Sequence, residues 1–341
     1  MERELRRKLR LLPKAELHVH LEGSLDPALL LELARRHDCA FGVATLADAR
    51  RLYSFHDFPG FLQAIIGACR HLVTPDDYAL AVRELTRRLA AQGIVYAEVF
   101  VSIGVLHWRK VEVAPYWEAI ESARRQAQEQ RGVRLAWIAD CVRQFGSEAA
   151  QRVLDECIRL MSNYSLVGIG IGGDEVKGSA EWFIEVFRRA RAAGLGLTAH
   201  AGETCGAASV WTAARDLAVH RIGHGLRAVE DHNLLQYLAE HDICLDVCQI
   251  SNRKTGVWNG ITPHSVVDFD KWRIKYSLAS DDPGIFGSSL LKELYAFPLD
   301  WPARHRALRQ GFLASFLPDS EKAAYLAAFD AAWRQLQLPN P

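Results

Sequence analysis

Leu195-Gly-Leu-Thr-Ala-His-Ala201 is a short, largely apolar run that ends beside a histidine, and Gly202-Glu203 then turns the chain. The run is too short for a helix and suits a buried strand, and helical periodicity follows it at about 207–218. A strand followed by a helix is the repeating unit of parallel sheets, because parallel neighbours need a helix-length crossover. The number of such units along the chain therefore predicts the fold.

Eight stretches have this character, and helical segments separate them. The predicted strands are 15–21, 94–101, 134–140, 167–171, 195–201, 221–225, 243–248 and 275–281. Eight successive units predict an α/β fold that closes into a (β/α)₈ TIM barrel. An open, doubly wound sheet is the alternative, but no Gly-x-Gly-x-x-Gly opens a helix after the first strand, as a dinucleotide-binding sheet would require.

The whole chain, 1–341, is predicted to form one barrel domain, since α/β barrels commonly need ~250 residues. Two helical regions extend the basic repeat. One is an insertion at about 26–92, in which Thr74-Pro75 has the form of a helix N-cap followed by proline at the first helical position. The other comprises C-terminal helices at about 288–338. The insertion is long enough to cover one mouth of the barrel.

The composition is that of an ordinary globular protein, with 49% hydrophobic residues and 41 basic residues that balance 41 acidic ones. This balance predicts neither a nucleic-acid partner nor a membrane partner. The basic N-terminal stretch lacks the long apolar run of a secretory signal, so we expect a cytoplasmic protein. The seven scattered cysteines contain no Cys-x-x-Cys pair and are expected to be free thiols.

Four polar residues at the predicted strand ends have the chemistry of metal ligands. In a barrel, the carboxyl ends of all strands meet on one face, where active sites are built. His18 and His20 are one residue apart on the first strand, so their side chains point to the same side. Together with His200 and Asp281 they offer three imidazoles and a carboxylate, a set that suits Zn²⁺ or another borderline divalent ion. A hydrogen-bonded pair would explain His18 and His20 alone, whereas the four residues together predict a metal site.

Further residues at the same face are candidates for catalysis and substrate binding. A zinc-activated water needs a partner for its proton, and Glu203 and His224 lie at the ends of the fifth and sixth strands. Asp282 follows the ligand Asp281 and can hydrogen-bond the substrate, while Gly173 lets a ligand approach the backbone closely. A core histidine and a carboxylate at a helix N-terminus are the alternative interpretations of His224 and Glu203.

Five motifs resemble the successive signatures of the adenosine deaminase family, in the family's order and over nearly the whole chain. They are Lys14-Ala-Glu-Leu-His-Val-His-Leu-Glu-Gly-Ser24, Gly172-Gly-Asp-Glu175, His200-Ala-Gly-Glu203, Arg221-Ile-Gly-His-Gly225 and Ser277-Leu-Ala-Ser-Asp-Asp-Pro283. The resemblance implies one zinc held by His18, His20, His200 and Asp281. It also implies that Glu203 protonates purine N1, His224 orients and deprotonates the attacking water, Asp282 hydrogen-bonds N7 and the Gly173 backbone meets N3. The implied reaction replaces the 6-amino group of a purine by oxygen and releases ammonia.

Other metal chemistries fit the sequence less well. A second metal bridged by a modified lysine lacks support, because the fourth predicted strand ends in glycines and Lys177 lies beyond them. The zinc deaminases that act on cytosine carry a Pro-Cys-x-x-Cys signature, which is absent here. A non-catalytic metal-binding protein is a remote alternative, since every catalytic position of the family is filled.

Glu22 bears on the choice of substrate. Adenosine deaminases usually carry aspartate at this position, which in the family meets the 5′ end of the ribose. Adenine deaminases share the glutamate but typically have aspartate in place of Gly223. Glu22, Gly172-Gly173 and Val142-Arg-Gln-Phe-Gly146 are most similar to the aminodeoxyfutalosine deaminases of the alternative menaquinone pathway.

The substrate of that subgroup is an adenine nucleoside with a benzoate-bearing extension at its 5′ end. Arg143, or Arg109 after the second strand, is the predicted cation for the benzoate carboxylate. Adenosine or deoxyadenosine is the first alternative substrate and free adenine the second. The sequence leaves the choice between monomer and homodimer open.

Overall fold

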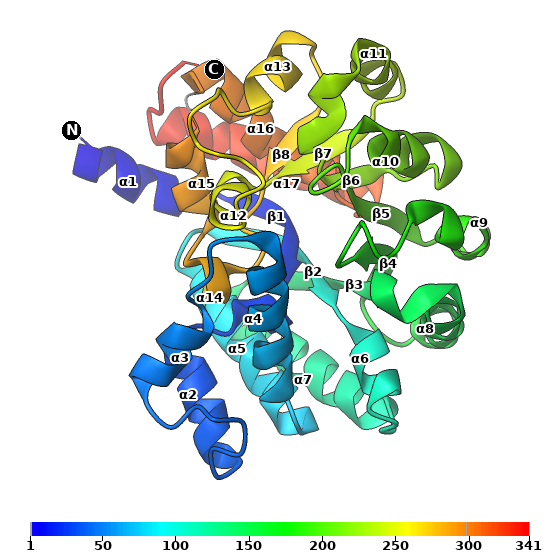
Figure 1. The fold of residues 1–341 in the computed structure, drawn as a ribbon. Coiled ribbons are helices and arrows are strands. Elements are labelled where there is room, and N and C mark those ends of the chain that lie inside the picture. The colour runs from blue at the N-terminus through cyan, green and yellow to red at the C-terminus, as the bar shows by residue number, and fades with distance from the viewer. Residues whose placement is uncertain (1, 298, 341) are drawn as a thin grey trace.

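The computed structural model describes residues 2–297 and 299–340, and its centre is one sheet of eight parallel strands (Figure 1). Each strand pairs with the next one in the chain, in the order β1 to β8. The strands are β1 (Lys14–His20), β2 (Ile94–Val101), β3 (Arg134–Val142), β4 (Leu166–Gly172), β5 (Gly196–Ala201), β6 (Arg221–His224), β7 (Cys244–Val247) and β8 (Tyr276–Leu278). The eight predicted strands are confirmed, although β8 ends three residues before the predicted boundary.

The sheet closes through the segment that follows β8. Val19 in β1 forms a parallel bridge with Asp281, in which His20 N donates to Asp281 O at 2.9 Å and Asp281 N donates to His18 O at 3.1 Å. These bonds join the last strand end to the first strand, as a closed barrel requires. The predicted TIM barrel is therefore confirmed.

A helical insertion separates β1 from β2, as predicted. It contains α2 (Pro27–Arg36), α3 (Leu46–Leu52), α4 (Phe58–Arg70) and α5 (Pro75–Ala90). Thr74 caps α5 in a reciprocal capping box with Asp77, and Pro75 occupies the first helical position. In Figure 1, α2 and α3 project at the lower left, whereas α4 lies closer to the barrel. The insertion therefore places α4 near one mouth of the barrel.

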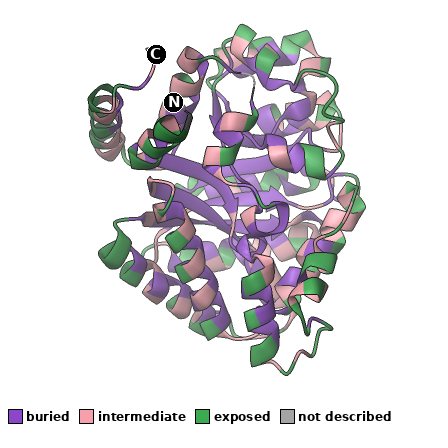
Figure 2. Ribbon diagram, turned by 90° about the vertical axis from the view of Figure 1, so that its left-hand side faces the viewer, coloured by how far each residue is buried: buried purple, intermediate pink, exposed green. Residues whose placement is uncertain are grey.

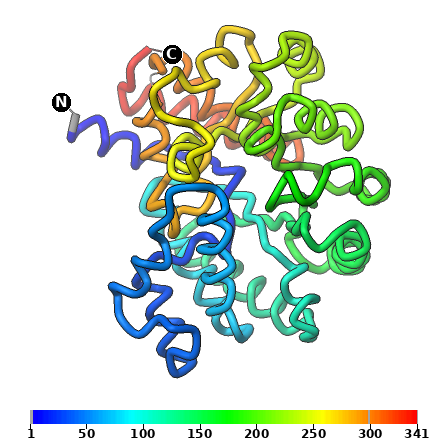
Figure 3. Tube along the Cα trace, in the orientation of Figure 1, coloured from blue at the N-terminus to red at the C-terminus, as the bar shows by residue number. Residues whose placement is uncertain are grey.

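The remaining helices surround the strands. They are α1 (Glu2–Leu11), α6 (Ile103–Trp108), α7 (Ala114–Arg131), α8 (Gly146–Leu160), α9 (Ile184–Ala192), α10 (Ala207–Trp211), α11 (His232–Glu240), α12 (Gln249–Lys254), α13 (Val266–Lys271), α14 (Pro283–Phe286), α15 (Leu290–Ala296), α16 (Trp301–Leu313) and α17 (Asp319–Gln335). The chain beyond α17 returns to α1, where Lys8 Nζ donates to Gln337 O at 3.4 Å (Figure 3). Within the described ranges, no helix has both the length and the apolar character needed to cross a bilayer.

Buried residues concentrate in the strands and on the inward faces of the helices (Figure 2). The barrel interior also holds a fully buried cation, Arg221 on β6. Its guanidinium lies 2.6 Å from Glu98 Oε2 and 3.2 Å from Asp246 Oδ2, and both carboxylates are fully buried. Phe316 lies across this guanidinium at 4.1 Å. A buried charge needs such paired partners, because an unpaired one would lose its hydration without compensation.

Candidate active site

The four predicted metal ligands converge at the carboxyl ends of their strands. His18 and His20 come from β1, His200 from β5 and Asp281 from the segment after β8, and one ligand atom of each lies within 4.8 Å of the others. His20 Nε2 is 3.1 Å from His200 Nε2 and 3.4 Å from Asp281 Oδ1. His18 Nε2 is 3.5 Å from the same carboxylate oxygen. The structure thus brings together all four residues that the sequence analysis selected.

The orientation of the imidazoles fits a bound cation. His200 Nδ1 lies 2.9 Å from Ile171 O, so a proton on Nδ1 leaves the Nε2 lone pair facing the cluster. Neither ring nitrogen of His18 has a hydrogen-bond partner among the described residues, although the side chain is fully buried. An imidazole buried without partners is unfavourable unless another group satisfies it. A divalent ion between these donors would do so, and nitrogen donors with a carboxylate suit zinc.

Charge also favours a cation at this place. Burial lowers the pKa of His20 to about 3 and that of His200 well below its ordinary value, so both imidazoles are neutral donors. Burial also disfavours a charged His18, but the carboxylates of Asp246 and Asp281 outweigh it and raise the pKa of His18 to about 9. The cluster therefore attracts positive charge through these carboxylates while keeping two neutral nitrogen ligands.

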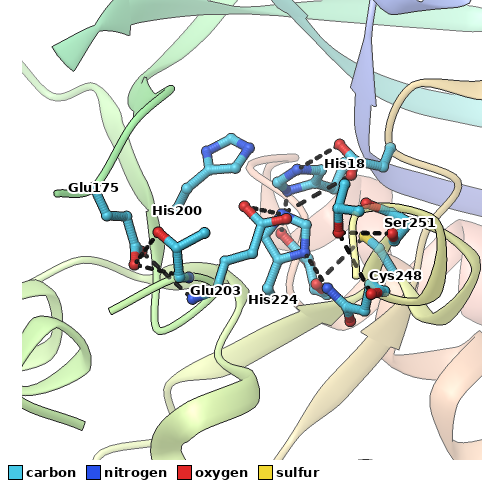
Figure 4. Close-up of polar contacts among 12 residues, drawn as sticks. His18, Glu175, His200, Glu203, His224, Cys248 and Ser251 are labelled. Atoms are coloured by element: carbon cyan, nitrogen blue, oxygen red, sulfur yellow. Dashed lines mark hydrogen bonds and ion pairs between the residues drawn. The ribbon is translucent and has the colours of Figure 1, made fainter. Parts of the chain in front are cut away.

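Glu203 and His224 face one another beside the cluster (Figure 4). Glu203 Oε2 is 3.6 Å from His224 Nε2, which in turn is 3.9 Å from Asp281 Oδ2. Burial, followed by the charges of Asp281 and Glu175, raises the pKa of Glu203 well above its usual range. Burial lowers the pKa of His224 to about 4. Burial thus favours the protonated acid and the neutral imidazole, the states that a proton donor and a proton acceptor require.

Neighbouring residues fix both side chains. The Glu175 carboxylate accepts hydrogen bonds from Cys205 N at 2.7 Å and Thr204 N at 3.2 Å, which holds the loop that carries Glu203 (Figure 4). The Asn252 amide lies 3.1 Å from His224 Nδ1. Because these bonds cross between elements, they hold the acid and the imidazole at a fixed separation.

Asp282 and Glu22 line the same cavity. Asp282 is buried, and burial together with the Asp281 charge raises the pKa of its carboxyl well above the usual range. Gly23 packs directly on this carboxyl, since a Cβ added to Gly23 would lie 2.6 Å from Asp282 Cβ. Glu22 Oε1 accepts a hydrogen bond from Ser102 N at 2.9 Å, and burial raises the pKa of Glu22 to about 7.

A cavity of about 480 Å³ connects these groups to solvent. Its inner part is polar and includes Gly173, as predicted, beside Gly172 and the metal-ligand cluster. Its outer part is apolar and is formed by side chains of α4, α6, the end of β3 and the segment after it. Gly173 has φ +99°, a conformation that side chains rarely adopt, and a Cβ there would also overlap the Gln144 side chain, so this position requires glycine.

The structure places Arg143 away from the cavity in which it was predicted to bind a carboxylate. This side chain is fully buried and does not line the cavity. Its guanidinium donates to Gly178 O at 2.8 Å and to His200 O, so it ties the loop after β4 to the end of β5. Arg109 does line the cavity, but its guanidinium donates to Cys69 O at 2.5 Å and Leu72 O at 2.6 Å. The Arg109 guanidinium is therefore already hydrogen-bonded to backbone carbonyls around the end of α4.

Asp140 is a cavity residue that the sequence analysis did not select. It lies near the end of β3, and burial, followed by the charge of Glu22, raises the pKa of its carboxyl to about 7. Its place near the end of a predicted strand was the available signal, the same signal that selected the metal ligands. Ser102, which donates to Glu22 through its backbone N–H, lines the same cavity.

A TIM barrel with histidine and aspartate ligands at its strand ends defines the class of the metal-dependent amidohydrolases. The chain belongs to the adenosine deaminase family, whose model, described as adenosine deaminase, matches residues 13–332. It is accordingly a hydrolase that acts on C–N bonds of cyclic amidines.

Relatives and solved structures agree with this assignment. The aminodeoxyfutalosine deaminase of Streptomyces avermitilis is 37% identical over 335 residues, which cover 94% of this chain and 92% of that protein. The adenine deaminase of Cupriavidus metallidurans is 33% identical over 338 residues, which cover 98% of this chain and 95% of that protein. An amidohydrolase from Burkhoderia ambifaria with bound Zn superposes with a TM-score of 0.88 at 25% identity, over 97% of this chain and 93% of that one.

Proposed function

We propose that this protein deaminates 6-amino-6-deoxyfutalosine, an adenine nucleoside whose 5′ extension ends in a benzoate, with one zinc ion as its cofactor. The similarity to the Streptomyces avermitilis enzyme supports this substrate, and the zinc-bound amidohydrolase supports this metal. The adenine deaminases are nearly as similar, so the choice between substrates depends on the cavity.

The metal cluster and four further residues of the inner cavity have the chemistry that purine deamination needs. Zinc at the histidine and aspartate cluster would supply a water activated for attack on purine C6. His224, whose pKa burial lowers to about 4, would accept a proton from the attacking water, and Glu203, whose pKa burial raises, would protonate N1. Asp282, whose pKa is raised by burial and by the Asp281 charge, hydrogen-bonds N7, while the Gly173 backbone meets N3. Protonation of N1 stabilises the charge that develops as the aromatic ring is attacked.

The observation that carries the proposal is the apolar outer part of the cavity. It is lined by Phe58, Phe61, Leu62, Ile65 and Ile66 of α4, Val105 and Trp108 of α6, Val142 at the end of β3 and Phe145 after it. The Trp108 ring stacks on that of Phe145 at a centroid separation of 6.5 Å, and Trp108 is 69% exposed. The whole cavity has the volume of sites that hold drug-sized ligands, ~300–1,000 Å³. Free adenine would leave this outer part empty, whereas an aromatic 5′ extension would cover it.

A cation is available at the rim for the benzoate carboxylate. Of the basic residues that line the cavity, Lys177 is paired with Asp174 at 3.1 Å, and Arg109 is bonded to backbone carbonyls. Arg70, in the last turn of α4, has no side-chain hydrogen bond or ion pair to any described residue. Arg70 therefore replaces Arg143 as the proposed partner of the carboxylate, because a guanidinium can bind both carboxylate oxygens.

A comparison of substrates tests the proposal. The zinc-loaded enzyme is assayed for ammonia release with aminodeoxyfutalosine, adenosine and adenine, and purine absorbance follows the same reactions. We expect the highest kcat/KM for aminodeoxyfutalosine, then adenosine, and the lowest for adenine. A preference for adenine would refute the proposed substrate and favour the adenine deaminase activity of the Cupriavidus relative.

A further inference from the structure

We infer that Asp140 is a specificity-determining residue that accepts hydrogen bonds from the ribose hydroxyls of a nucleoside substrate. Asp140 is only 5% exposed and lines the cavity, and its Oδ1 has no hydrogen-bond partner in the described structure. A buried acceptor left without a partner costs about 1–3 kcal/mol, which a hydroxyl donated by the substrate would recover. The inference rests on the proposed deamination of an adenine nucleoside.

The Asp140 carboxyl group lies where the ribose of a bound purine nucleoside would be placed. A Cβ added to Gly172 would lie 3.1 Å from Asp140 Oδ2, 3.2 Å from Oδ1 and 3.3 Å from Cε1 of the metal ligand His200. The carboxyl group is therefore adjacent to the glycine pair at which purine N3 is placed. Ring atom N9, which carries the ribose, is separated from N3 by a single carbon, so the sugar leaves the base near Asp140.

The neighbours of Asp140 support the same direction. The charge of Glu22 contributes to the raised pKa of Asp140, so the two carboxyl groups lie close together, and Ser102 N, in the same cavity lining, donates to Glu22 Oε1 at 2.9 Å. Glu22 occupies the position that meets the ribose 5′ end in the family. Asp140 and Glu22 therefore form one polar wall between the purine cavity and the apolar outer cavity, where a ribose would connect the two.

Other roles for this carboxylate fit less well. Among the described residues, two clusters have donor atoms close enough together to hold a metal ion. Asp140 belongs to neither of them. The nearby Arg143 does not pair with it, because that guanidinium bonds to Gly178 O and His200 O. Both the ionised and the protonated carboxyl retain an acceptor oxygen, so hydroxyl recognition does not depend on the protonation state of Asp140.

Kinetics with a series of nucleosides test the role. The zinc-loaded wild type, Asp140→Asn and Asp140→Ala are compared on adenosine, 2′-deoxyadenosine, 3′-deoxyadenosine and 2′,3′-dideoxyadenosine. We expect Asp140→Ala to lower kcat/KM for adenosine by about 10- to 100-fold, mainly through KM, and to change that for the dideoxynucleoside less than threefold. Asp140→Asn keeps one acceptor oxygen and should retain much of the wild-type preference.

Inhibition constants for inosine and 2′,3′-dideoxyinosine give the same comparison without turnover, and zinc content and thermal unfolding show whether each variant is intact. An equal loss on all substrates and inhibitors would overturn the inference, since it would indicate a general structural role. An unchanged preference in Asp140→Ala would also overturn it. A wild type that acts only on adenine would instead refute the proposed function, which separates the two failures.

Discussion

Replacing Gly23 by alanine tests whether turnover requires Asp282 in its present position. Gly23 has no positive φ, so its backbone accepts alanine and the effect of the substitution is steric. The added methyl would overlap the Asp282 carboxyl group and lie 2.6 Å from its Cβ. Asp282 has little freedom to move, because its carbonyl accepts hydrogen bonds from Ile285 N at 3.1 Å and Phe286 N at 2.9 Å. The carboxyl group must therefore rotate away from the place where purine N7 would be bound.

Two magnitudes follow from this contact. Extra volume in a packed region costs about 1–3 kcal/mol, which should appear as a lower free energy of unfolding. Loss of a hydrogen bond between neutral groups costs about 0.5–1.5 kcal/mol in transition-state binding, equivalent to roughly a 2- to 13-fold lower kcat/KM. Zinc content should remain at the wild-type level. The three atoms nearest to the new methyl group all belong to Asp282, and none belongs to a predicted metal ligand.

Steady-state kinetics, metal analysis and thermal unfolding measure these effects together. Gly104→Ala is the matched control, since its Cβ would meet only ordinary contacts, the nearest at 3.6 Å from Phe145, and should leave kcat/KM unchanged. Adding Gly23→Ala to Asp282→Ala should lower kcat/KM little further, because both changes act through the same side chain. Wild-type kcat/KM in Gly23→Ala, or full additivity in the double variant, would refute the reasoning.

Further predictions concern the proton donor, the metal, the rim and the pH profile. Glu203→Gln should keep its zinc but lose at least about 100-fold in kcat, because an amide has no acidic proton to donate. His200→Ala should lose activity and also lose zinc, as measured by metal analysis. Equal turnover in Glu203→Gln and wild type would contradict the role of Glu203. Arg70→Ala should raise KM for aminodeoxyfutalosine by about two- to fivefold, the scale of an exposed ion pair, and leave KM for adenosine unchanged, with Arg83→Ala as a surface control. The kcat/KM profile should fall on the acid side only as pH approaches the His224 pKa of about 4, because the imidazole must be neutral, and an acid limb centred near 6.5 would oppose that assignment.

The barrel and its metal-ligand cluster could be predicted because both depend on simple rules. Alternation of strands and helices fixes a parallel sheet, and closure brings His18, His200 and Asp281 to one face although they are far apart in sequence. The end of β8 could not be predicted as well. The ladder ends at Leu278, and Asp281 adopts φ 63°, a conformation that interrupts a strand and that apolar patterning does not encode.

The outer cavity shows where sequence reasoning was insufficient. Arg143 follows β3 in a short 3₁₀ turn, and the direction of a side chain in such a turn depends on the surrounding carbonyls. Arg70 lies in a helix of the insertion, so no strand-end rule relates it to the site. Asp140, in contrast, obeyed the strand-end rule and could have been selected with the metal ligands.

The buried contacts of Arg221 have a consequence for how this barrel can diverge between lineages. Losing either Glu98 or Asp246 alone would leave part of a buried charge uncompensated, at a cost of about 3–5 kcal/mol. We therefore expect descendants of a common ancestor to exchange these three residues as a set or to retain them. Asp246 also faces His18 at 3.7 Å, so the same inheritance extends to the metal ligands. Arg70 has no comparable buried partners in the described part of the chain, so it can be substituted without loss of stability. Substrate preference can therefore change during evolution while the residues at the centre of the barrel are conserved.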